Sequence, residues 1–229
     1  MKRQFDPAVP ELMDRPQPVS KELADDLRNL RQLNRFFGSY ALVGRFLRRW
    51  IKAGDRLHIV DLATGSGDIP RIVVDYARKA GATVKIDAVD RQSATLEIAK
   101  HLSENYPEIS FIAADILEWQ PSAPAEVVLC SLVLHHFSEE DAVRVLCRCR
   151  ELSKQFVLVS DLRRGLLASV GVFLLTELIF RNPMTRYDAR ASAARAFSFK
   201  EFRSLAERAG WKAFGHKKFR FARQAIWLD

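Results

Sequence analysis

From residue 57 onward, short runs of apolar residues alternate with longer segments whose apolar residues recur every three or four positions. The short runs predict strands and the longer segments predict helices, because these spacings match the two periods. Repeated strand–helix units indicate a parallel sheet covered by helices on both faces, which is an α/β fold. The predicted strands cover 57–62, 84–89, 109–113, 126–131 and 155–160, and the helices between them cover 69–80, 93–104 and 139–152.

The beginning of the chain follows a different pattern. Residues 1–19 contain four prolines and show no helical or strand period, so we predict an extended arm there. Ser20 is a suitable N-cap, and leucines recur after it at helical spacing. We therefore predict one helix up to Phe37 and a second over 40–51, which together form a helical cap over residues 20–54.

The end of the chain also departs from the alternation. An apolar run over 166–180 opens an expected helical insertion over 166–195, which we place within a main domain of residues 55–229. The elements expected after it are a helix at 198–209, capped by Ser198, and a hairpin of strands 211–216 and 219–228 with Lys217 and Lys218 at its turn.

The apolar run does not predict a membrane span. It is shorter than the roughly 20 residues that a helix needs to cross a bilayer, and it contains Glu177. The N-terminus is charged and rich in proline and has no apolar core, so it does not resemble a signal peptide. We therefore expect a cytoplasmic protein, and leave contact with a membrane surface open.

The composition and the distribution of charge limit which partners and metal sites we expect. The 229 residues suit one α/β domain, and 48% of them are apolar. A net charge of +8 suggests nucleic-acid binding, but residues 55–150 carry −5 and the positive charge lies on their flanks, so we expect no nucleic-acid partner. Cys130, Cys147 and Cys149 have neither CxxC spacing nor a nearby histidine pair, so we predict no metal site and no disulfide.

The turn after the first predicted strand carries the clearest chemical signal. Residues 61–68 read Asp-Leu-Ala-Thr-Gly-Ser-Gly-Asp and lead into a predicted helix. Glycines let the backbone approach a ligand, and the helix start presents free N–H groups. No lysine follows in the P-loop pattern, and Pro70 stands where a dinucleotide fingerprint needs Gly or Ala. The turn therefore favours a ligand without phosphates.

Two further carboxylates end the next two predicted strands. Asp90 follows the second strand, at the position that binds ribose hydroxyls in doubly wound folds, and Asp115 follows the third. Because the carboxyl ends of parallel strands meet at one edge of a sheet, we expect these residues and the 61–67 turn to converge on one ligand site.

With these residues the chain resembles class I S-adenosylmethionine-dependent methyltransferases over about residues 20–229. The resemblance rests on the 61–67 turn, Asp90, Ala114-Asp115 and the fourth strand. It implies a Rossmann-like methyltransferase fold: a seven-stranded, mostly parallel sheet with helices on both faces, a helical cap and an insertion after the fifth strand. Ala63 stands where the commonest family version has Gly, and this variant is similar to the turn of ubiquinone and menaquinone methyltransferases.

The resemblance also implies the cofactor and its contacts. The cofactor would be S-adenosyl-L-methionine, with its methionine part on the 61–67 turn, its ribose on Asp90 and its adenine at Asp115 and Ile116. The full set of candidate cofactor-binding residues is Asp61, Ala63, Thr64, Gly65, Gly67, Asp90, Arg91, Asp115, Ile116 and Ser131.

The fourth predicted strand runs into a histidine pair. Family members that methylate exocyclic amines or glutamine carry Asn/Asp-Pro-Pro-aromatic here, and its absence favours an oxygen or carbon acceptor. An imidazole suits a general base near neutral pH, so His135 and His136 are the candidate catalytic residues. Two alternatives stay open: a purely structural histidine, and transfer by proximity and alignment alone.

A second resemblance concerns the acceptor. The Pro10–Asp14 segment, the stretch Leu30-x-x-Leu33-Asn34 and the Asp161–Arg164 segment are similar to methyltransferases that accompany bacterial type III polyketide synthases. That resemblance implies a lipophilic phenol as the acceptor. The arginine-bracketed run 166–180 is either a buried helix or a wall for such an acceptor near a membrane. The candidate substrate-side residues are Asn34, Phe37, Arg163, Arg164 and Tyr187.

The leading hypothesis is methyl transfer to a phenolic or quinol oxygen of a lipophilic polyketide- or quinone-like small molecule. Methylation of a ring carbon is the near alternative, and an RNA or protein methyltransferase is the alternative of another class. A non-catalytic partner subunit is less favoured, because the turn and both strand-end carboxylates are intact. The oligomeric state stays open.

Overall fold

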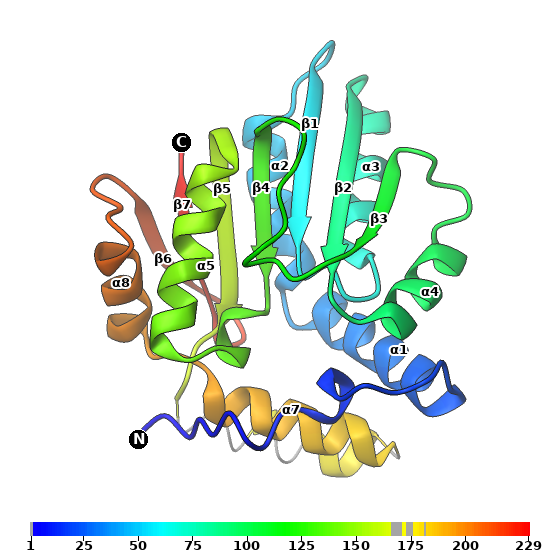
Figure 1. Ribbon diagram of the computed structural model, residues 1–229, viewed down its shortest axis with the longest axis vertical. Coiled ribbons are helices and arrows are strands. Elements are labelled where there is room, and N and C mark those ends of the chain that lie inside the picture. The colour runs from blue at the N-terminus through cyan, green and yellow to red at the C-terminus, as the bar shows by residue number, and fades with distance from the viewer. Residues whose placement is uncertain (1, 166–170, 173–175, 181) are drawn as a thin grey trace.

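The computed structural model describes residues 2–165, 171–172, 176–180 and 182–229. Within them, seven strands form one sheet in the order β3-β2-β1-β4-β5-β7-β6 (Figure 1). The first five are parallel, and β7 and β6 join as an antiparallel pair, which confirms the predicted mostly parallel sheet. The strands are β1 (Arg56–Leu62), β2 (Thr83–Asp90), β3 (Ile109–Ala113), β4 (Ala125–Ser131), β5 (Ser153–Leu162), β6 (Gly215–Phe219) and β7 (Arg223–Leu228).

Helices cover both faces of this sheet, as the apolar strands require. Ile59 of β1 packs in a cluster with α2 and α3, whereas its neighbour Val60 packs in a cluster with α5 and α8. Successive strand residues point to opposite faces, so a strand buried on both faces is apolar throughout. The helices are α1 (Lys21–Phe36), α2 (Ser39–Trp50), α3 (Asp68–Ala80), α4 (Ser93–Leu102), α5 (Glu139–Glu151), α7 (Pro183–Arg195) and α8 (Phe199–Arg208), with 3-10 turns η1 (Leu12–Asp14) and η2 (Leu134–His136).

Local sequence signals explain several helix starts. The Ser20 side chain accepts a hydrogen bond from the Leu23 amide at the start of α1. Asn182 caps α7, which has proline at its first position, and Ser198 with Glu201 forms a capping box at α8. These caps occupy amide groups that the helix itself leaves unpaired.

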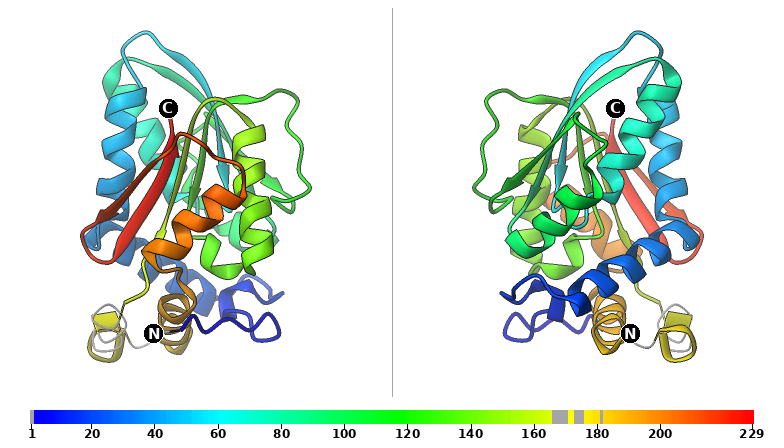
Figure 2. Two further views of the ribbon diagram at one scale, coloured as in Figure 1. Left: turned by 90° about the vertical axis from the view of Figure 1, so that its left-hand side faces the viewer. Right: turned by 90° about the vertical axis from the view of Figure 1, so that its right-hand side faces the viewer.

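A third layer lies beneath the carboxyl ends of the parallel strands. It consists of the N-terminal arm, α1 and α7, which lie together in all three ribbon views (Figures 1 and 2). A buried contact joins the two helices: Thr185 of α7 donates to Asp26 of α1 at 2.6 Å. Within the predicted cap of residues 20–54, α1 belongs to this layer, whereas α2 packs with α3 against the sheet.

The C-terminal hairpin differs from the prediction. Lys217 and Lys218 lie inside β6, and the turn lies at 220–222, where Phe221 and Ala222 both have positive φ angles of 55° and 53°. Neither residue type signals such a turn, which glycine and asparagine favour. The strand expected from residue 211 begins instead at Gly215, which pairs with Trp227. A Cβ at Gly215 would lie 1.9 Å from the Trp227 ring, so packing requires glycine at this position.

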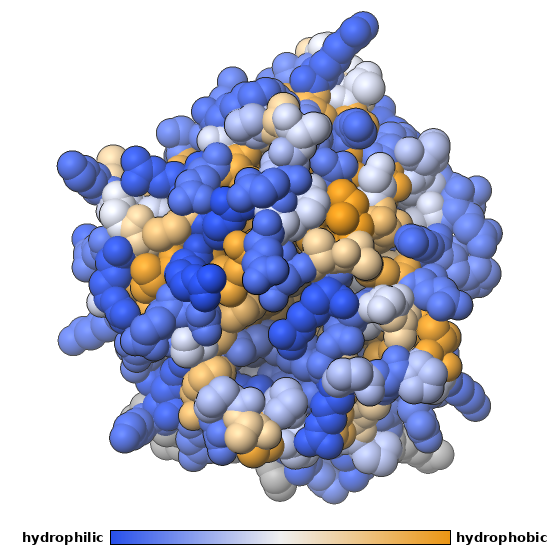
Figure 3. Space-filling model, viewed as in Figure 1, coloured by the Kyte–Doolittle hydropathy of each residue, from blue (hydrophilic) through white to orange (hydrophobic). Residues whose placement is uncertain are grey.

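The structure also bears on whether the chain could cross a membrane and on the apolar run over residues 166–180. Among the described residues, no helix combines the length and apolarity needed to cross a bilayer. Much of the run over 166–180 lies outside the described residues; within the described part Phe180 is buried and Leu178 and Ile179 are exposed. The face shown in Figure 3 is mostly hydrophilic, with small hydrophobic patches between charged side chains.

Candidate active site

The turn between β1 and α3 is held against the neighbouring strand by its backbone. The Thr64 amide donates to the Val89 carbonyl at 3.0 Å, and the Gly65 amide donates to Asp90 Oδ2 at 2.8 Å. Ala63 adopts a φ of 56°, in the left-handed region where an alanine costs about 1 kcal/mol. The residue that departs from the family pattern therefore sits where glycine is favoured, and it keeps the conformation nonetheless.

The two glycines of the turn serve different purposes. A Cβ at Gly67 would lie 2.9 Å from the Phe111 ring, so packing requires glycine there. Gly65 has a φ of 54° and faces open space, with no atom within 4 Å of a Cβ built on it. This cradle at Gly65 leaves room for a ligand to approach the backbone.

Carboxylates surround the turn. Asp61 is 2% exposed, and burial raises its pKa to about 8, with the nearby Asp68 and Asp90 adding to the effect. Burial also raises the pKa of Asp90, although its Oδ1 accepts the Gln92 amide at 2.9 Å in addition to the Gly65 bond. Such a cluster attracts positive charge, because a cationic ligand favours the ionised carboxylates.

The third carboxylate of this cluster connects the turn to the N-terminal helices. Asp68 accepts a hydrogen bond from Asn34 at 3.1 Å and one from the Tyr40 hydroxyl at 2.8 Å. Asn34, a predicted substrate-side residue, therefore positions a carboxylate beside the turn as well as bordering the cavity.

A cavity of about 780 Å³ extends from the turn to the histidine pair. Its apolar part is formed largely by α1, through Leu27, Leu30, Leu33 and Phe37. The predicted site residues that line it are Asn34, Phe37, Asp61, Ala63, Thr64, Gly65, Asp90, Arg91, Asp115, Ile116, Ser131, His135, His136 and Arg163.

Three predicted site residues do not line the cavity. Gly67 packs against Phe111 behind the turn. Arg164 turns inward and donates to Glu201 at 2.7 Å and to the Ala196 carbonyl at 2.6 Å, so it joins the end of β5 to α8. Tyr187 lies on an exposed part of α7. In each of the three cases, closeness in sequence to the site did not place the residue on the cavity wall.

Both histidines of η2 are paired with carboxylates. His135 is 3% exposed, and its Nδ1 lies 2.6 Å from Asp161 Oδ1. His136 Nδ1 lies 2.6 Å from Asp14 Oδ2 of the N-terminal arm. Burial by itself lowers the pKa of His136, but the carboxylates of Glu11 and Asp14 outweigh it and raise that pKa to about 9.

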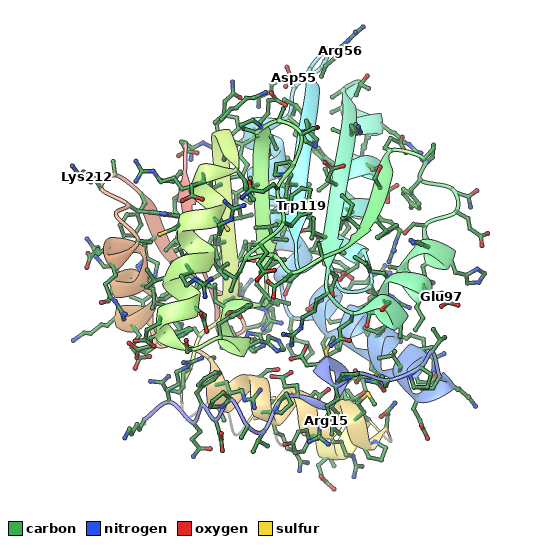
Figure 4. All side chains as sticks on the ribbon, in the orientation of Figure 1. Arg15, Asp55, Arg56, Glu97, Trp119 and Lys212 are labelled. Carbon is green, nitrogen blue, oxygen red and sulfur yellow. The ribbon has the colours of Figure 1, made fainter. Side chains whose placement is uncertain are left out.

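The arm supplies functional residues that the sequence reasoning did not assign. Glu11 and Asp14 reach the histidines from about 120 residues earlier in the chain, and Arg3 anchors the arm by donating to the carbonyls of His135, Phe137 and Arg195. The signal available was a pair of acidic residues in a proline-rich segment. Figure 4 shows Arg15 beside α7, at the end of the molecule opposite Asp55 and Arg56.

Comparison with known proteins identifies this arrangement. A family model described as a methyltransferase domain matches residues 59–155, which contain the turn, Asp90, Asp115 and both histidines. The fold matches human N-acetylserotonin methyltransferase in complex with S-adenosylmethionine, with a TM-score of 0.64 over 90% of this chain and 55% of that one, at 17% identity. Residues 59–155 therefore form a methyltransferase domain.

Curated relatives are similar to this chain over part of their own length. Strychnine O-methyltransferase of Strychnos nux-vomica is 31% identical over 53% of this chain and 28% of the relative. The 2-phytyl-1,4-naphtoquinone methyltransferase of Thermosynechococcus vestitus is 28% identical over 49% of this chain and 45% of the relative. The chain spans less than half the length of each.

The cofactor of this domain is S-adenosylmethionine, and the residues present fit it. The open cradle at Gly65 admits a ligand, and the carboxylates of Asp61 and Asp90 suit a cationic sulfonium and a ribose diol. No phosphate-binding lysine follows the turn, which agrees with a cofactor without phosphates.

Proposed function

We propose that this protein methylates an oxygen atom of a lipophilic small molecule, with S-adenosylmethionine as methyl donor. The observation that carries the proposal is the shared cavity, which joins the glycine turn and its carboxylates to two carboxylate-paired imidazoles. A donor bound at one end and an acceptor at the other would meet inside a space that the arm and α1 shield.

Different residues at the cofactor end would bind different parts of the methyl donor. We assign the methionine part of the donor to the 61–67 turn and its ribose to Asp90. Asp115 and Ile116 would hold the adenine, with Arg91 and Ser131 at the border of the cavity. Asp90 is already oriented by two backbone amides, so little conformational entropy is lost when it binds a diol.

The acceptor end suits a phenol or quinol. Its wall combines leucines and Phe37 of α1 with His135 and His136, so it can bind an apolar ring and a hydroxyl together. At the histidine wall the hydroxyl would pass its proton to Nε2 of His135, whose Nδ1 is paired with Asp161. When bound, the donor supplies a methyl carbon to which the oxygen forms a bond, while the carbon–sulfur bond breaks and its electron pair passes to sulfur.

Two curated relatives support an apolar acceptor, whereas a third, from Klebsiella pneumoniae, is named for the organic acid trans-aconitate. One is named for strychnine and another for a phytyl-substituted naphthoquinone, and both names describe small molecules with large apolar parts. A quinol or a polyketide-type phenol is therefore the acceptor that we propose to test first.

The experiment is transfer of radiolabelled methyl groups by the purified chain. A panel of long-chain resorcinols and hydroquinones is compared with tRNA and with protein, and labelled product is identified by mass spectrometry. We expect label on oxygen of a phenol or quinol. Label on a ring carbon, on RNA or on protein, with none on oxygen, would contradict the proposal.

Substitution of His135 by alanine tests the histidine wall. We expect turnover to fall by about 10²–10⁴-fold, the usual contribution of a proton-transfer residue, with S-adenosylhomocysteine affinity unchanged. The matched control is His101→Ala, because His101 is an exposed histidine on α4 paired with Glu104. Equal turnover in the two variants would remove His135 from the mechanism.

A further inference from the structure

Three side chains with metal-ligand chemistry meet at the acceptor end of the cavity. They are Glu11 of the arm and His135 and His136 of η2, and all three border the cavity. His135 Nε2 lies 3.9 Å from Glu11 Oε1, and His136 Nε2 lies 4.0 Å from Glu11 Oε2. One potential ligand atom from each residue lies within 4.8 Å of those from the other two residues.

Hydrogen bonding orients the free nitrogens toward Glu11. The Nδ1 atom of each ring lies 2.6 Å from a carboxylate oxygen, of Asp161 for His135 and of Asp14 for His136. Because an ionised carboxylate only accepts, each Nδ1 carries a hydrogen, and Nε2 is the nitrogen that a metal ion would bind after displacing any proton there. Ligating histidines in metal sites are held in this way by a carboxylate at their other nitrogen.

Glu11 faces both Nε2 atoms without a hydrogen bond to either. The two Nε2 atoms lie 3.9 and 4.0 Å from its two oxygens, which is too long for a hydrogen bond. Glu11 is 1% exposed, and its nearest donor is the Ser192 hydroxyl at 2.9 Å. A buried carboxylate needs positive charge close to it, and a cation between Glu11 and the two rings would supply that charge.

Charged groups of both signs surround this cluster. Besides Glu11 itself, three carboxylates face it from the arm, β5 and α7, namely Asp14, Asp161 and Asp188. The cations near them are Arg195 at 3.8 Å from Glu11, Arg91 at 3.9 Å from Asp14, and Arg3, whose guanidinium is bonded to three carbonyls.

We propose that Glu11, His135 and His136 bind one divalent transition-metal cation, with Zn²⁺ the best match. Two imidazoles and one carboxylate with the remaining position open are a ligand set of catalytic zinc sites. Ligand atoms about 2.0–2.2 Å from a tetrahedral centre lie about 3.4 Å apart. One ligand atom from each residue now lies within 4.8 Å of the other two, so the pairs would close by up to about 1.4 Å on binding.

The purpose of the cation rests on the proposed function. Its open position faces the cavity, where the acceptor hydroxyl would coordinate. Coordination lowers the pKa of a bound hydroxyl, so the proton is released to water and the oxygen becomes the nucleophile for the methyl carbon. Cation binding itself needs no acceptor and is measured separately.

The test is zinc binding by the full-length chain. After chelator treatment and dialysis, Zn²⁺ is titrated in competition with a chromophoric chelator, and metal content is measured by plasma mass spectrometry. We expect one zinc per chain and an affinity at least about 100-fold weaker in Glu11→Gln and His136→Gln. The matched control, His101→Gln, should bind like the parent chain.

A variant of Asp161, which pairs with a proposed ligand but is not one itself, should weaken zinc binding less than a ligand variant does. Asp161→Asn keeps the shape of the residue beside His135 and should weaken zinc binding by about 10–100-fold, as loss of such partners does. Calorimetry with S-adenosylhomocysteine shows that each variant is folded. No bound zinc in the parent chain, or equal affinity in Glu11→Gln and His101→Gln, would overturn the proposal.

The two proposals fail in different ways. Zinc bound by these residues in a chain that labels only RNA or protein would leave the site standing and remove the phenol as acceptor. Phenol methylation at full rate in the zinc-free chain would remove the catalytic purpose of the cation. Phenol methylation that is lost on chelation and restored by zinc is the result we expect.

Discussion

The two ends of the cavity are built in opposite ways. At the cofactor end, the polar groups are satisfied within a short stretch of chain, as the Gly65 and Gln92 amides are by Asp90. At the acceptor end, His136 pairs with Asp14 and Glu11 with Ser192, over separations of 122 and 181 residues. The cofactor end is therefore a local motif, whereas the acceptor end exists only when the N-terminal arm and α7 have folded against η2.

This difference has a consequence for energetics. The two Asp90 bonds at the cofactor end use backbone that the sheet already holds in place. The acceptor end buries charged side chains on the arm and α7, and it is stable only while every partner is present. We expect substitutions at the first end to weaken cofactor binding and substitutions at the second to open the molecule.

The largest effect is expected for Asp90→Ala. The variant removes the acceptor of two backbone amides and the proposed partner of the ribose, and each lost charged hydrogen bond costs about 1.5–3 kcal/mol. Calorimetry should show S-adenosylhomocysteine binding weakened by about 100-fold or more. Asp87→Ala, on the same strand but paired with His58, should bind normally; similar losses in both variants would mean that the strand, and not the carboxylate, is responsible.

Arg3→Ala tests the acceptor end. Loss of the bonds to His135, Phe137 and Arg195 should release the arm, so hydrogen exchange over residues 2–15 rises and turnover falls about tenfold, an effect of one to two charged hydrogen bonds. Cofactor affinity should change much less than in Asp90→Ala. The control is Arg28→Ala, which removes an exposed ion pair on α1. An arm that stays protected in Arg3→Ala would refute its role as anchor.

The stability of the folded protein should depend on pH through Asp61 at the cofactor end. The folded pKa of Asp61 is about 8 against an ordinary value of 3.8, so the folded chain holds a proton that the unfolded chain loses. Stability of the cofactor-free protein should then fall as pH rises from about 4 to about 8. Melting temperatures measured across this range should fall less steeply in Asp61→Asn than in the parent or in the exposed control Asp75→Asn. Parallel curves would show that Asp61 does not titrate in this window.

The smallest effect is expected for Ala63→Gly. Glycine removes the strain of a φ of 56°, but it also makes the unfolded chain more flexible, and these two contributions of about 1 kcal/mol nearly cancel. Urea denaturation should place the variant within about 0.5 kcal/mol of the parent chain. A loss of several kcal/mol would mean that the alanine methyl has a packing role.

Periodicity and turn chemistry predicted much of the fold. Apolar runs of strand length, separated by helical periods, predicted five parallel strands, and Ser20 and Ser198 marked two helix starts that the structure contains. The hairpin turn was predicted wrongly, because Phe221 and Ala222 adopt positive φ angles that their side chains do not signal. There the docking of Phe221 on Phe37 accompanies a turn that local preference does not favour.

The candidate site also contains residues that the sequence predicts and residues that only the tertiary structure brings together. The sequence by itself determined the turn, Asp90 and Asp115, since strand-end residues of a parallel sheet converge whatever the rest of the chain does. Only the tertiary structure decided that Arg164 points into the protein, and that Glu11 and Asp14 meet the histidine pair. Side-chain pairs across more than 100 residues depend on how the arm and α7 pack, and no local period or spacing encodes that.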